Sequence, residues 1–440
     1  MQAGSARTRK LLARRRQALM QAAGGEAILI LPAAPERIRS RDTHYPYRQD
    51  SDFWYLTGCV EPEAVLVLVP GRRHGEAILF CRERDPEREG WDGPRLGPDG
   101  AVDALGLDDA YPIGDIDDIL PGLLEGRRRV YYHLGRDAEF DLKLIGWLNR
   151  VRAQARQDAQ PPQEFLELGH LLDEMRLFKS AEEVALMQKA ADISVEAHRA
   201  AIRAARPGIH EYELQAELEY VFRRHGAQPA YPSIVGAGAN ACILHYGENI
   251  AKARAGELVL IDAGAEYAGY AADITRTFPV SGRFTRAQRA LHDLVCRAQA
   301  AALAQAQPGR PYAAIHEAAV QTLADGLLSL GLLRGTLESV IASGEYRRYY
   351  RHKTGHWLGL DVHDVGEYRI DGASRLLEPG MVLTIEPGLY IPAADATVAP
   401  EWRGIGIRIE DDVLITRDGY RVLTAALERS AEEMEALMAG

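Results

Sequence analysis

Cysteine is scarce in this sequence. Four cysteines occur among 440 residues, and no two of them form a CxxC pair. Cys59, Cys81, Cys242 and Cys296 are too widely spaced for a disulfide-stapled scaffold or a cysteine-based zinc site. This low cysteine content is typical of proteins in the reducing cytoplasm, and we expect a cytoplasmic location.

Long apolar runs and a basic excess are absent as well. Apolar runs such as residues 27–34 and 64–70 fall far short of the about 20 residues that a membrane-spanning helix needs. Lys and Arg total 52 against 63 Asp and Glu, a net charge of −11, whereas nucleic-acid-binding domains usually carry a basic excess. We therefore expect no membrane and no nucleic acid as a partner.

The N-terminal segment is rich in arginine and superficially similar to a targeting peptide. Leu11, Leu12, Leu19 and Met20 recur at helical spacing among the arginines, and no small-residue cleavage pattern follows. This pattern favours an amphipathic opening helix over a transit peptide.

Strand and helix patterns then alternate through the first part of the chain. A helix is expected over residues 140–151, and the polar, Gly/Pro-rich residues 82–100 are expected to form an exposed loop. Buried strands are predicted over residues 27–31, 64–69, 77–81 and 130–134. Such alternation predicts a compact α/β domain over residues 1–175.

Residues 176–440 show longer helices in blocks between short strand pairs, which predicts a second, α+β domain. Ser180 and Glu183 form a capping-box signature before a helical run that ends near residue 204. Further helices are predicted over residues 212–225, 286–305 and 312–330, and strands over residues 258–262, 381–386 and 405–410.

Two segments of the second domain repeat one another. Residues 255–264 (AGELVLIDAG) and 379–388 (PGMVLTIEPG) begin 124 positions apart and share Gly, Ile, an acidic residue and Gly at equivalent places. Each reads as a turn, a buried strand, a carboxylate and a turn, followed by a strand with another acid, Asp273 or Glu410. The repeat predicts a pseudo-twofold domain with four carboxylates near its centre.

The first strand pair allows a geometric prediction. A hairpin that turns at Tyr267 and Ala268 sets Asp262 directly opposite Asp273, with Cβ atoms about 5 Å apart. Two carboxylates beside the apolar run 258–261 repel each other and lose hydration, and a bound cation removes both costs. The alternative is a solvated hairpin edge with acidic side chains, which the apolar run disfavours.

Alternation along the last strand places Arg408 and Glu410 on one face, opposite three isoleucines. Glu386 shares a face with Thr384 at the end of another apolar strand. An acid in such a position is seldom buried unless it is paired or bound to a metal. A plain salt bridge between Arg408 and Glu410 is the alternative, and it is compatible with a place in the site.

Three of the 13 histidines, His352, His356 and His363, fall within twelve residues. His352 and His356 have zincin spacing, but no Glu follows His352, so the HExxH motif is absent. Nearby glycines favour a loop over a helix. His245 stands in a strand-like segment. A structural role is expected for the histidines of helical or connecting segments, which are His198, His210, His225, His292 and His316.

Together these residues resemble the pita-bread metallopeptidases, the family that includes methionine aminopeptidase, prolidase and aminopeptidase P. Residues 355–366 (GHWLGLDVHDVG), 379–390 (PGMVLTIEPGLY) and 404–411 (GIGIRIED) carry the resemblance, and residues 47–58 (YRQDSDFWYLTG) are most similar to bacterial aminopeptidase P. The resemblance spans nearly the whole chain. It implies an α/β N-terminal domain followed by an α+β pseudo-twofold pita-bread catalytic domain.

The resemblance also implies a dinuclear metal site. Asp273 and Glu410 would bridge two divalent metal ions, Asp262 would complete the coordination of one ion, and His356 with Glu386 that of the other. This oxygen-rich ligand set suits Mn²⁺. A hydroxide that bridges the two metals would attack the peptide bond.

Further roles follow from the same resemblance. Glu386 would be the general base, and His245 and His363 would hydrogen-bond the substrate carbonyl and the tetrahedral intermediate. The candidates for the substrate side are His352, Arg408 and Tyr390.

The implied activity is release of the N-terminal residue from peptides whose second residue is proline. Prolidase activity, restricted to Xaa-Pro dipeptides, is the alternative. The sequence at residues 357–361 and 401–403 is more similar to aminopeptidase P than to prolidase. A metal-free scaffold is disfavoured because all five ligands are present. Family analogy further implies a homo-oligomer, either a dimer or a tetramer.

Overall fold

The structure is a computed structural model that describes residues 5–154, 156 and 158–439. The chain forms two compact units, and the division in sequence falls between Met175 and Arg176. In the described part of the chain, no helix is both long enough and apolar enough to cross a membrane.

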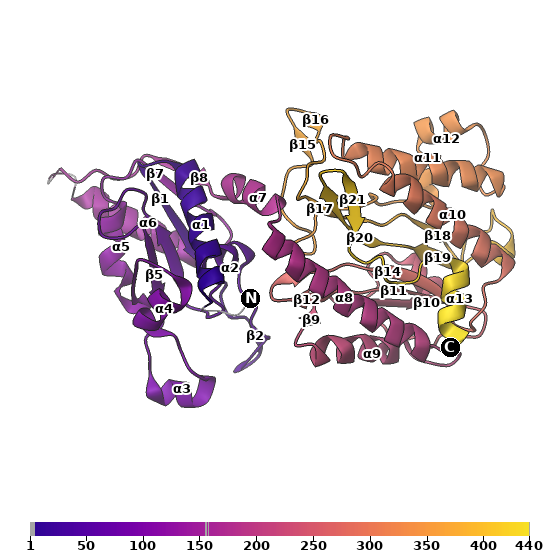
Figure 1. Ribbon diagram of the computed structural model, residues 1–440, viewed down its shortest axis with the longest axis horizontal. Coiled ribbons are helices and arrows are strands. Elements are labelled where there is room, and N and C mark those ends of the chain that lie inside the picture. The colour runs from indigo at the N-terminus through magenta and orange to yellow at the C-terminus, as the bar shows by residue number, and fades with distance from the viewer. Residues whose placement is uncertain (1–4, 155, 157, 440) are drawn as a thin grey trace. The chain divides into compact units, whose positions relative to one another are not determined.

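The N-terminal unit is built on a six-stranded mixed sheet with the order β6-β5-β4-β1-β7-β8 (Figure 1). These strands are β1 (Ala27–Pro32), β4 (Val65–Leu68), β5 (Ala77–Cys81), β6 (Asp109–Pro112), β7 (Arg129–Tyr132) and β8 (Glu164–Glu167), and a small ribbon pairs β2 (Ile38–Ser40) with β3 (Thr43–His44). The helices are α1 (Ala6–Ala23), α2 (Ser51–Thr57), α3 (Pro86–Asp92), α4 (Gly97–Leu105), α5 (Ile116–Leu124), α6 (Ala138–Ala153) and α7 (Gly169–Leu177). The sheet buries its aliphatic side chains against α5 and α6, which confirms the predicted α/β architecture.

The opening helix forms as predicted, but two of its arginines are buried. Arg15 and Arg16 are 5% and 2% exposed, and each donates a hydrogen bond of 2.9 Å, to the carbonyl oxygens of Tyr55 and Leu56 respectively. These carbonyls belong to the last turn of α2, where helix carbonyls lack intrahelical partners. The arginines therefore stabilise the end of α2.

The prediction of a loop over residues 82–100 is wrong in part. The segment contains α3 and the start of α4. Asp85 accepts hydrogen bonds from the backbone amides of Glu87 and Arg88, and Pro86 occupies the first helical turn. A capping residue followed by proline is a helix start signal, which the high Gly and Pro content obscured.

The C-terminal unit places short strands between two helix pairs (Figure 1). The α8–α9 pair packs on β10, β11 and β14, and the α10–α11 pair packs on β18 and β19. The helices are α8 (Ala181–Ala204), α9 (Glu211–Arg224), α10 (Arg286–Leu303), α11 (Ala313–Ser329), α12 (Leu337–Ser343) and α13 (Ala431–Ala439). The strands are β9 (Gln228–Pro229), β10 (Ile234–Ala237), β11 (Leu258–Asp262), β12 (Ala265–Tyr267), β13 (Tyr270–Ala271), β14 (Thr275–Pro279), β15 (Arg369–Ile370), β16 (Ala373–Ser374), β17 (Val382–Ile385), β18 (Gly388–Ile391), β19 (Ile405–Arg408), β20 (Asp411–Thr416) and β21 (Gly419–Val422).

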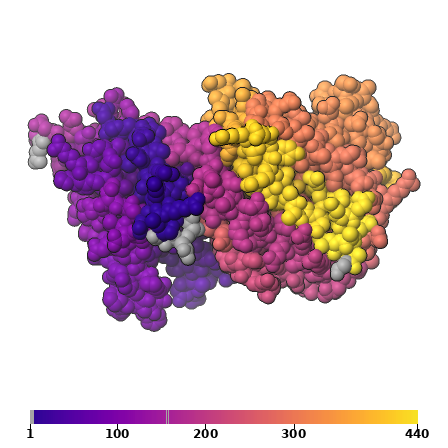
Figure 2. Space-filling view, in the orientation of Figure 1, coloured from indigo at the N-terminus to yellow at the C-terminus, as the bar shows by residue number. Residues whose placement is uncertain are grey.

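The first and last helices of this unit, α8 and α13, contribute side chains to the same core. The predicted capping box of α8 is present, with Ser180 and Glu183 each bonding the other's backbone. The last helix, α13, inserts Met434 and Leu437 into the core beneath α8 and α9. In Figure 2 the C-terminal segment, in yellow, lies across the surface of this unit.

The pseudo-twofold arrangement predicted from the repeat is present. In each half a helix pair is followed by an antiparallel strand pair, β11 with β14 and β17 with β20. The halves join where Thr275 pairs with Glu410, whose backbone amide donates a 3.0 Å hydrogen bond to the Thr275 carbonyl. The ends of the four strands therefore meet at the centre of the unit.

The predicted hairpin register is wrong by two residues. Asp262 pairs with Thr275, not Asp273, and the tight turn lies at Ala268 and Gly269 between the paired Tyr267 and Tyr270. Ala268 and Gly269 have φ values of 50° and 85°, as a two-residue hairpin turn of the favoured kind requires. Glycine tolerates this conformation without strain, which places the turn one residue further along the chain than predicted.

Candidate metal centre

A cavity of about 710 Å³ lies where the two strand pairs meet. Its walls include nine of the ten site residues predicted from the sequence. The tenth, Tyr390, is fully buried and contacts two of the others.

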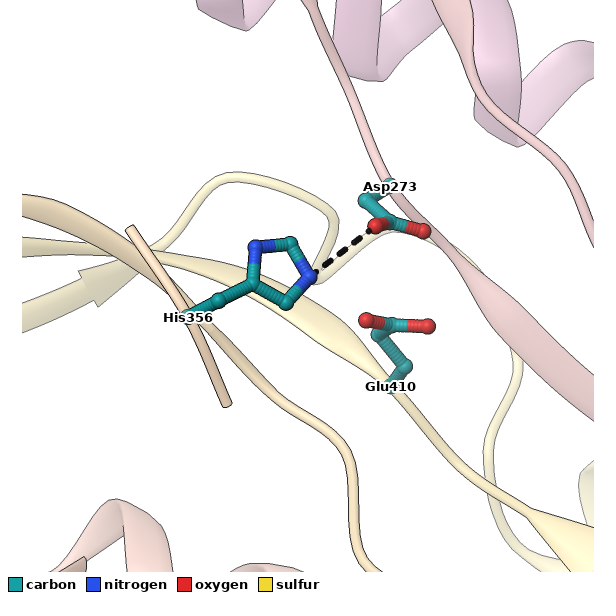
Figure 3. Close-up of side chains that lie close together, drawn as sticks. All are labelled: Asp273, His356 and Glu410. Atoms are coloured by element: carbon teal, nitrogen blue, oxygen red, sulfur yellow. Dashed lines mark ion pairs between the residues drawn. The ribbon is translucent and has the colours of Figure 1, made fainter. Parts of the chain in front are cut away.

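Asp273, His356 and Glu410 lie closest together (Figure 3). One ligand atom from each lies within 4.8 Å of the other two, and His356 Nε2 is 3.4 Å from Asp273 Oδ2. His356 Nδ1 donates to the Trp357 carbonyl at 2.9 Å, which leaves Nε2 facing the acids. A ring nitrogen held in this way is typical of a metal-ligating histidine.

Glu386 and Asp262 complete the acidic cluster. Glu386 follows β17, with its Oε1 atom 3.8 Å from His356 Nε2. Asp262 ends β11 and does not face Asp273 across the hairpin, yet the Tyr231 hydroxyl contacts both carboxylates, at 2.6 and 2.5 Å. The predicted proximity of the two aspartates is therefore reached by a different geometry.

The electrostatics of the cluster fit a divalent cation. Burial raises the pKa of Glu386 to about 7, and burial together with the neighbouring carboxylates raises the pKa of Glu410 well above its usual range. Burial opposes a charge on His356, but the Asp273 carboxylate raises the pKa of that imidazole to about 9. Excess buried negative charge of this kind is relieved by a hard metal ion, which oxygen ligands prefer.

Arg408 pairs with Asp262, so the predicted alternative of a salt bridge to Glu410 is not what forms. Its Nη2 atom is 2.5 Å from Asp262 Oδ2, and its Nη1 atom donates to the Tyr390 hydroxyl at 3.0 Å. The same hydroxyl is 2.8 Å from Nε2 of His352. His352 and Arg408 thus line the cavity side by side and are joined through the hydroxyl of the buried Tyr390 behind them.

The remaining two predicted histidines stand on exposed parts of the cavity wall. The ring of His363 lies 4.4 Å from the ring of His356, nearly perpendicular to it. His245 lies in a turn and not in the strand-like conformation predicted. Both imidazoles line the cavity and are exposed at its surface.

A buried ion-pair network lies beneath the loop that carries His363. Asp364 accepts from Lys179 Nζ at 2.9 Å and from Arg176 Nη2 at 2.5 Å. The side chains of Lys179 and Asp364 are each 1% exposed. The loop from Trp357 to Asp364 is closed by the Asp364 amide, which donates to the Trp357 carbonyl at 2.9 Å.

Three of the site residues that were not predicted contact predicted ones or line the cavity. Tyr231 contacts two acids, as described above. The buried Thr354 accepts a hydrogen bond from the Glu386 amide at its carbonyl, at 2.8 Å, and its hydroxyl is 2.8 Å from Nδ1 of His316. His316, for which a structural role was expected, lines the cavity. Of these three residues, only Thr354 could have been suspected from the sequence, because it lies between the predicted site residues His352 and His356.

Comparison with known proteins places the two parts of the chain in known families. Residues 185–417 match the model of metallopeptidase family M24, and residues 12–131 match that of the aminopeptidase P N-terminal domain. The Xaa-Pro aminopeptidase of Escherichia coli (strain K12) is 49% identical over 98% of both chains. That of Haemophilus influenzae is 43% identical over 93% of both chains.

Solved structures give the same result. The Pseudomonas aeruginosa aminopeptidase PepP superposes with a TM-score of 0.97 at 58% identity over 98% of both chains. Two structures of Escherichia coli aminopeptidase P, a variant in complex with substrate and a Zn-substituted form in complex with product, each reach a TM-score of 0.95 at 47% identity over 98% of both chains.

Proposed function

The chain belongs to metallopeptidase family M24, with an aminopeptidase P N-terminal domain ahead of the peptidase domain, and we propose that it releases the N-terminal residue from peptides whose second residue is proline. The observation that carries this proposal is the cluster of four carboxylates and His356 around one cavity, in a chain 49% identical to an Xaa-Pro aminopeptidase.

Asp262, Asp273, His356, Glu386 and Glu410 would hold two divalent cations, and we propose Mn²⁺ because carboxylate oxygens dominate the set. When bound, such ions lower the pKa of a water molecule and polarise a carbonyl group. Elemental analysis of the purified protein tests the metal, with two Mn²⁺ per chain expected. Chelation should abolish activity and Mn²⁺ should restore it, so full hydrolysis by metal-free protein would contradict the proposal.

The protein's own groups have separate tasks in this reaction. Glu386 would accept a proton from the attacking water and deliver it to the prolyl nitrogen as the C–N bond breaks. His245 and His363 would donate hydrogen bonds to the scissile carbonyl oxygen as negative charge develops on it.

Proline specificity requires recognition by shape. A prolyl imide lacks the N–H group that ordinary peptidases bind, and its ring fixes φ. His352 and Arg408, with Tyr390 behind them, would lie on the proline side, whereas the free ammonium of the substrate would be attracted by the acidic cluster.

A matched set of peptides tests the specificity. We expect Xaa-Pro-Yaa to be cleaved far faster than Xaa-Ala-Yaa, and N-acetylated Xaa-Pro-Yaa to resist cleavage. Cleavage of the Xaa-Pro dipeptide alone would favour prolidase. Equal cleavage of the proline and alanine peptides would show that the position within the family is wrong.

Two further proposals concern the oligomeric state, which rests on family analogy, and the compartment, which rests on the low cysteine content. We propose a cytoplasmic homo-oligomer, either a dimer or a tetramer, of the 48.6 kDa chain. Sedimentation at micromolar concentration should give a heavier species, and a 48.6 kDa species alone would contradict the oligomer. Cell fractionation tests the compartment.

A further inference from the structure

His245 is carried by a segment with little regular structure. After β10 the chain forms a short 3-10 helix, η3 (Gly238–Cys242), and then a turn and residues without regular secondary structure as far as Ala251. His245 itself is exposed at the cavity wall. Its position therefore depends on whatever holds the 238–251 segment in place.

One buried carboxylate, that of Glu211 at the start of α9, accepts three hydrogen bonds from this segment and one from Ala237, the residue just before it. Oε1 accepts from the Ala237 amide at 2.7 Å and from the Asn240 side-chain amide at 2.9 Å. Oε2 accepts from the Tyr246 hydroxyl at 2.9 Å and from the Ala251 amide at 2.7 Å. The contacts thus include the residue before the segment, its 3-10 helix, the residue that follows His245 and its last residue.

The chemistry of this contact is specific to a carboxylate. Glu211 is fully buried, and it forms no ion pair with any of the described residues. A buried carboxylate is tolerated when hydrogen bonds satisfy its oxygens, and here all four partners are donors. A glutamine at this position would turn an NH₂ group toward two donors and would leave them unsatisfied.

The outer side of the segment is held by close packing. A Cβ atom on Gly406 of β19 would lie 2.2 Å from the Ala241 carbonyl oxygen, and one on Gly236 of β10 would lie 2.9 Å from the Ala241 amide nitrogen. The 3-10 helix therefore rests directly on two strands, and Glu211 supplies the polar contacts that fix its register against them.

We propose that Glu211 is a positioning residue that holds His245 where it can contact the substrate carbonyl, an inference that rests on the proposed peptidase function. Glu211 does not touch the cavity, so it acts only through the segment that carries His245.

A double-mutant cycle tests the proposal on the metal-loaded enzyme. Removal of a transition-state donor by His245→Ala should lower kcat by about 10²–10³-fold. Glu211→Gln should lower kcat by about 10- to 100-fold, with little change in KM or metal content, because it misplaces that donor. In the His245→Ala background Glu211→Gln should change kcat by less than about twofold, since the group it positions is gone.

A milder variant and a matched control keep the result interpretable. Tyr246→Phe removes only the hydroxyl that joins the residue after His245 to Glu211, and its effect on kcat should also vanish in the His245→Ala background. Glu213→Gln alters another carboxylate of the same helix, one whose hydrogen bond among the described residues goes to the backbone amide of its own N-cap, His210, and it should leave kcat unchanged.

Hydrogen exchange supplies a readout that does not depend on turnover. The amides of Ala237 and Ala251 should exchange faster in Glu211→Gln than in the Glu213→Gln control. Unchanged exchange and kcat in Glu211→Gln, or an undiminished loss in the His245→Ala background, would overturn the inference. An inactive wild-type enzyme would refute the proposed function instead, while exchange still reports whether Glu211 holds the segment.

Discussion

Glu386 and His363 differ in what a substitution at each would remove. Glu386 is half-buried beside His356, whereas His363 is an exposed side chain at the cavity wall. In the proposed mechanism the first is a metal ligand and a proton acceptor, and the second only a hydrogen-bond donor. Metal content and turnover should therefore separate in the two variants.

We expect Glu386→Gln to lose metal and to lower kcat by about 10²–10⁴-fold, because it removes the proton acceptor. His363→Ala should lower kcat by about 10²–10³-fold and retain its metal. Steady-state kinetics with elemental analysis of the same preparations measures both quantities. Equal metal loss in the two variants would refute the division of roles.

Site residues on the repeated strands could be predicted from the sequence. Site residues that lie far from those strands in the sequence could not. Asp262 and Glu386 end or directly follow apolar strands, and Glu410 lies two residues beyond β19, so strand periodicity predicts their positions. Tyr231 lies 31 residues from Asp262 and 42 from Asp273 and matches no motif. Only the folded chain brings its hydroxyl to both carboxylates.

At the scale of elements, the loop from Trp357 to Asp364 owes its shape to charges buried below it. Lys179 and Arg176 converge on the Asp364 carboxylate from the segment that precedes α8. A buried carboxylate that loses its partners is costly, whereas an exposed lysine contributes little.

We expect Lys179→Met to lower the free energy of unfolding by about 3 kcal/mol, the lower end of the range for breaking a buried pair, because Arg176 remains. Lys189→Met, on the exposed face of α8, should cost less than about 0.5 kcal/mol. Urea denaturation of both variants measures the difference. Similar losses in the two variants would show that the network does not stabilise the fold.

The boundaries of helices and strands were predicted more accurately from the sequence than the pairing register of the strands. The predicted strand over residues 258–262 forms as β11, because a short continuous apolar run is typical of a buried strand. The hairpin beside it was misplaced because several small residues near Ala268 are compatible with a turn, and only the demand for two positive φ values selects Ala268 and Gly269.

For the whole molecule, stability should depend on metal and pH together. Without metal, His356 has a pKa of about 9 against an ordinary value of 6.5. The folded state therefore holds a proton that the unfolded state releases, and this contribution to stability is complete below pH 6.5 and lost as pH rises through 9. The pKa of Glu386 is raised from 4.5 to about 7. Its contribution to stability has the same sign and is lost as the pH rises from 4.5 through 7.

The melting temperature of metal-free protein should consequently fall between pH 6.5 and 9 more steeply than that of metal-loaded protein, in which His356 and Glu386 are proposed ligands. Thermal unfolding of both forms in the same buffers measures this difference. Parallel curves would show that the acidic cluster does not control stability. Metal should also raise the melting temperature at every pH where it binds the folded state alone.

The junction at Thr275 and Glu410 has a consequence for biosynthesis. These two residues lie 135 positions apart, and a ribosome adding about 5–20 residues per second needs on the order of 10 s to make the chain between them. During that interval the nascent polypeptide presents Asp262 and Asp273 without the partners from the second half. The complete set of proposed ligands is therefore present only once residue 410 has been made, and a cation bound before that stage would lack Glu386 and Glu410.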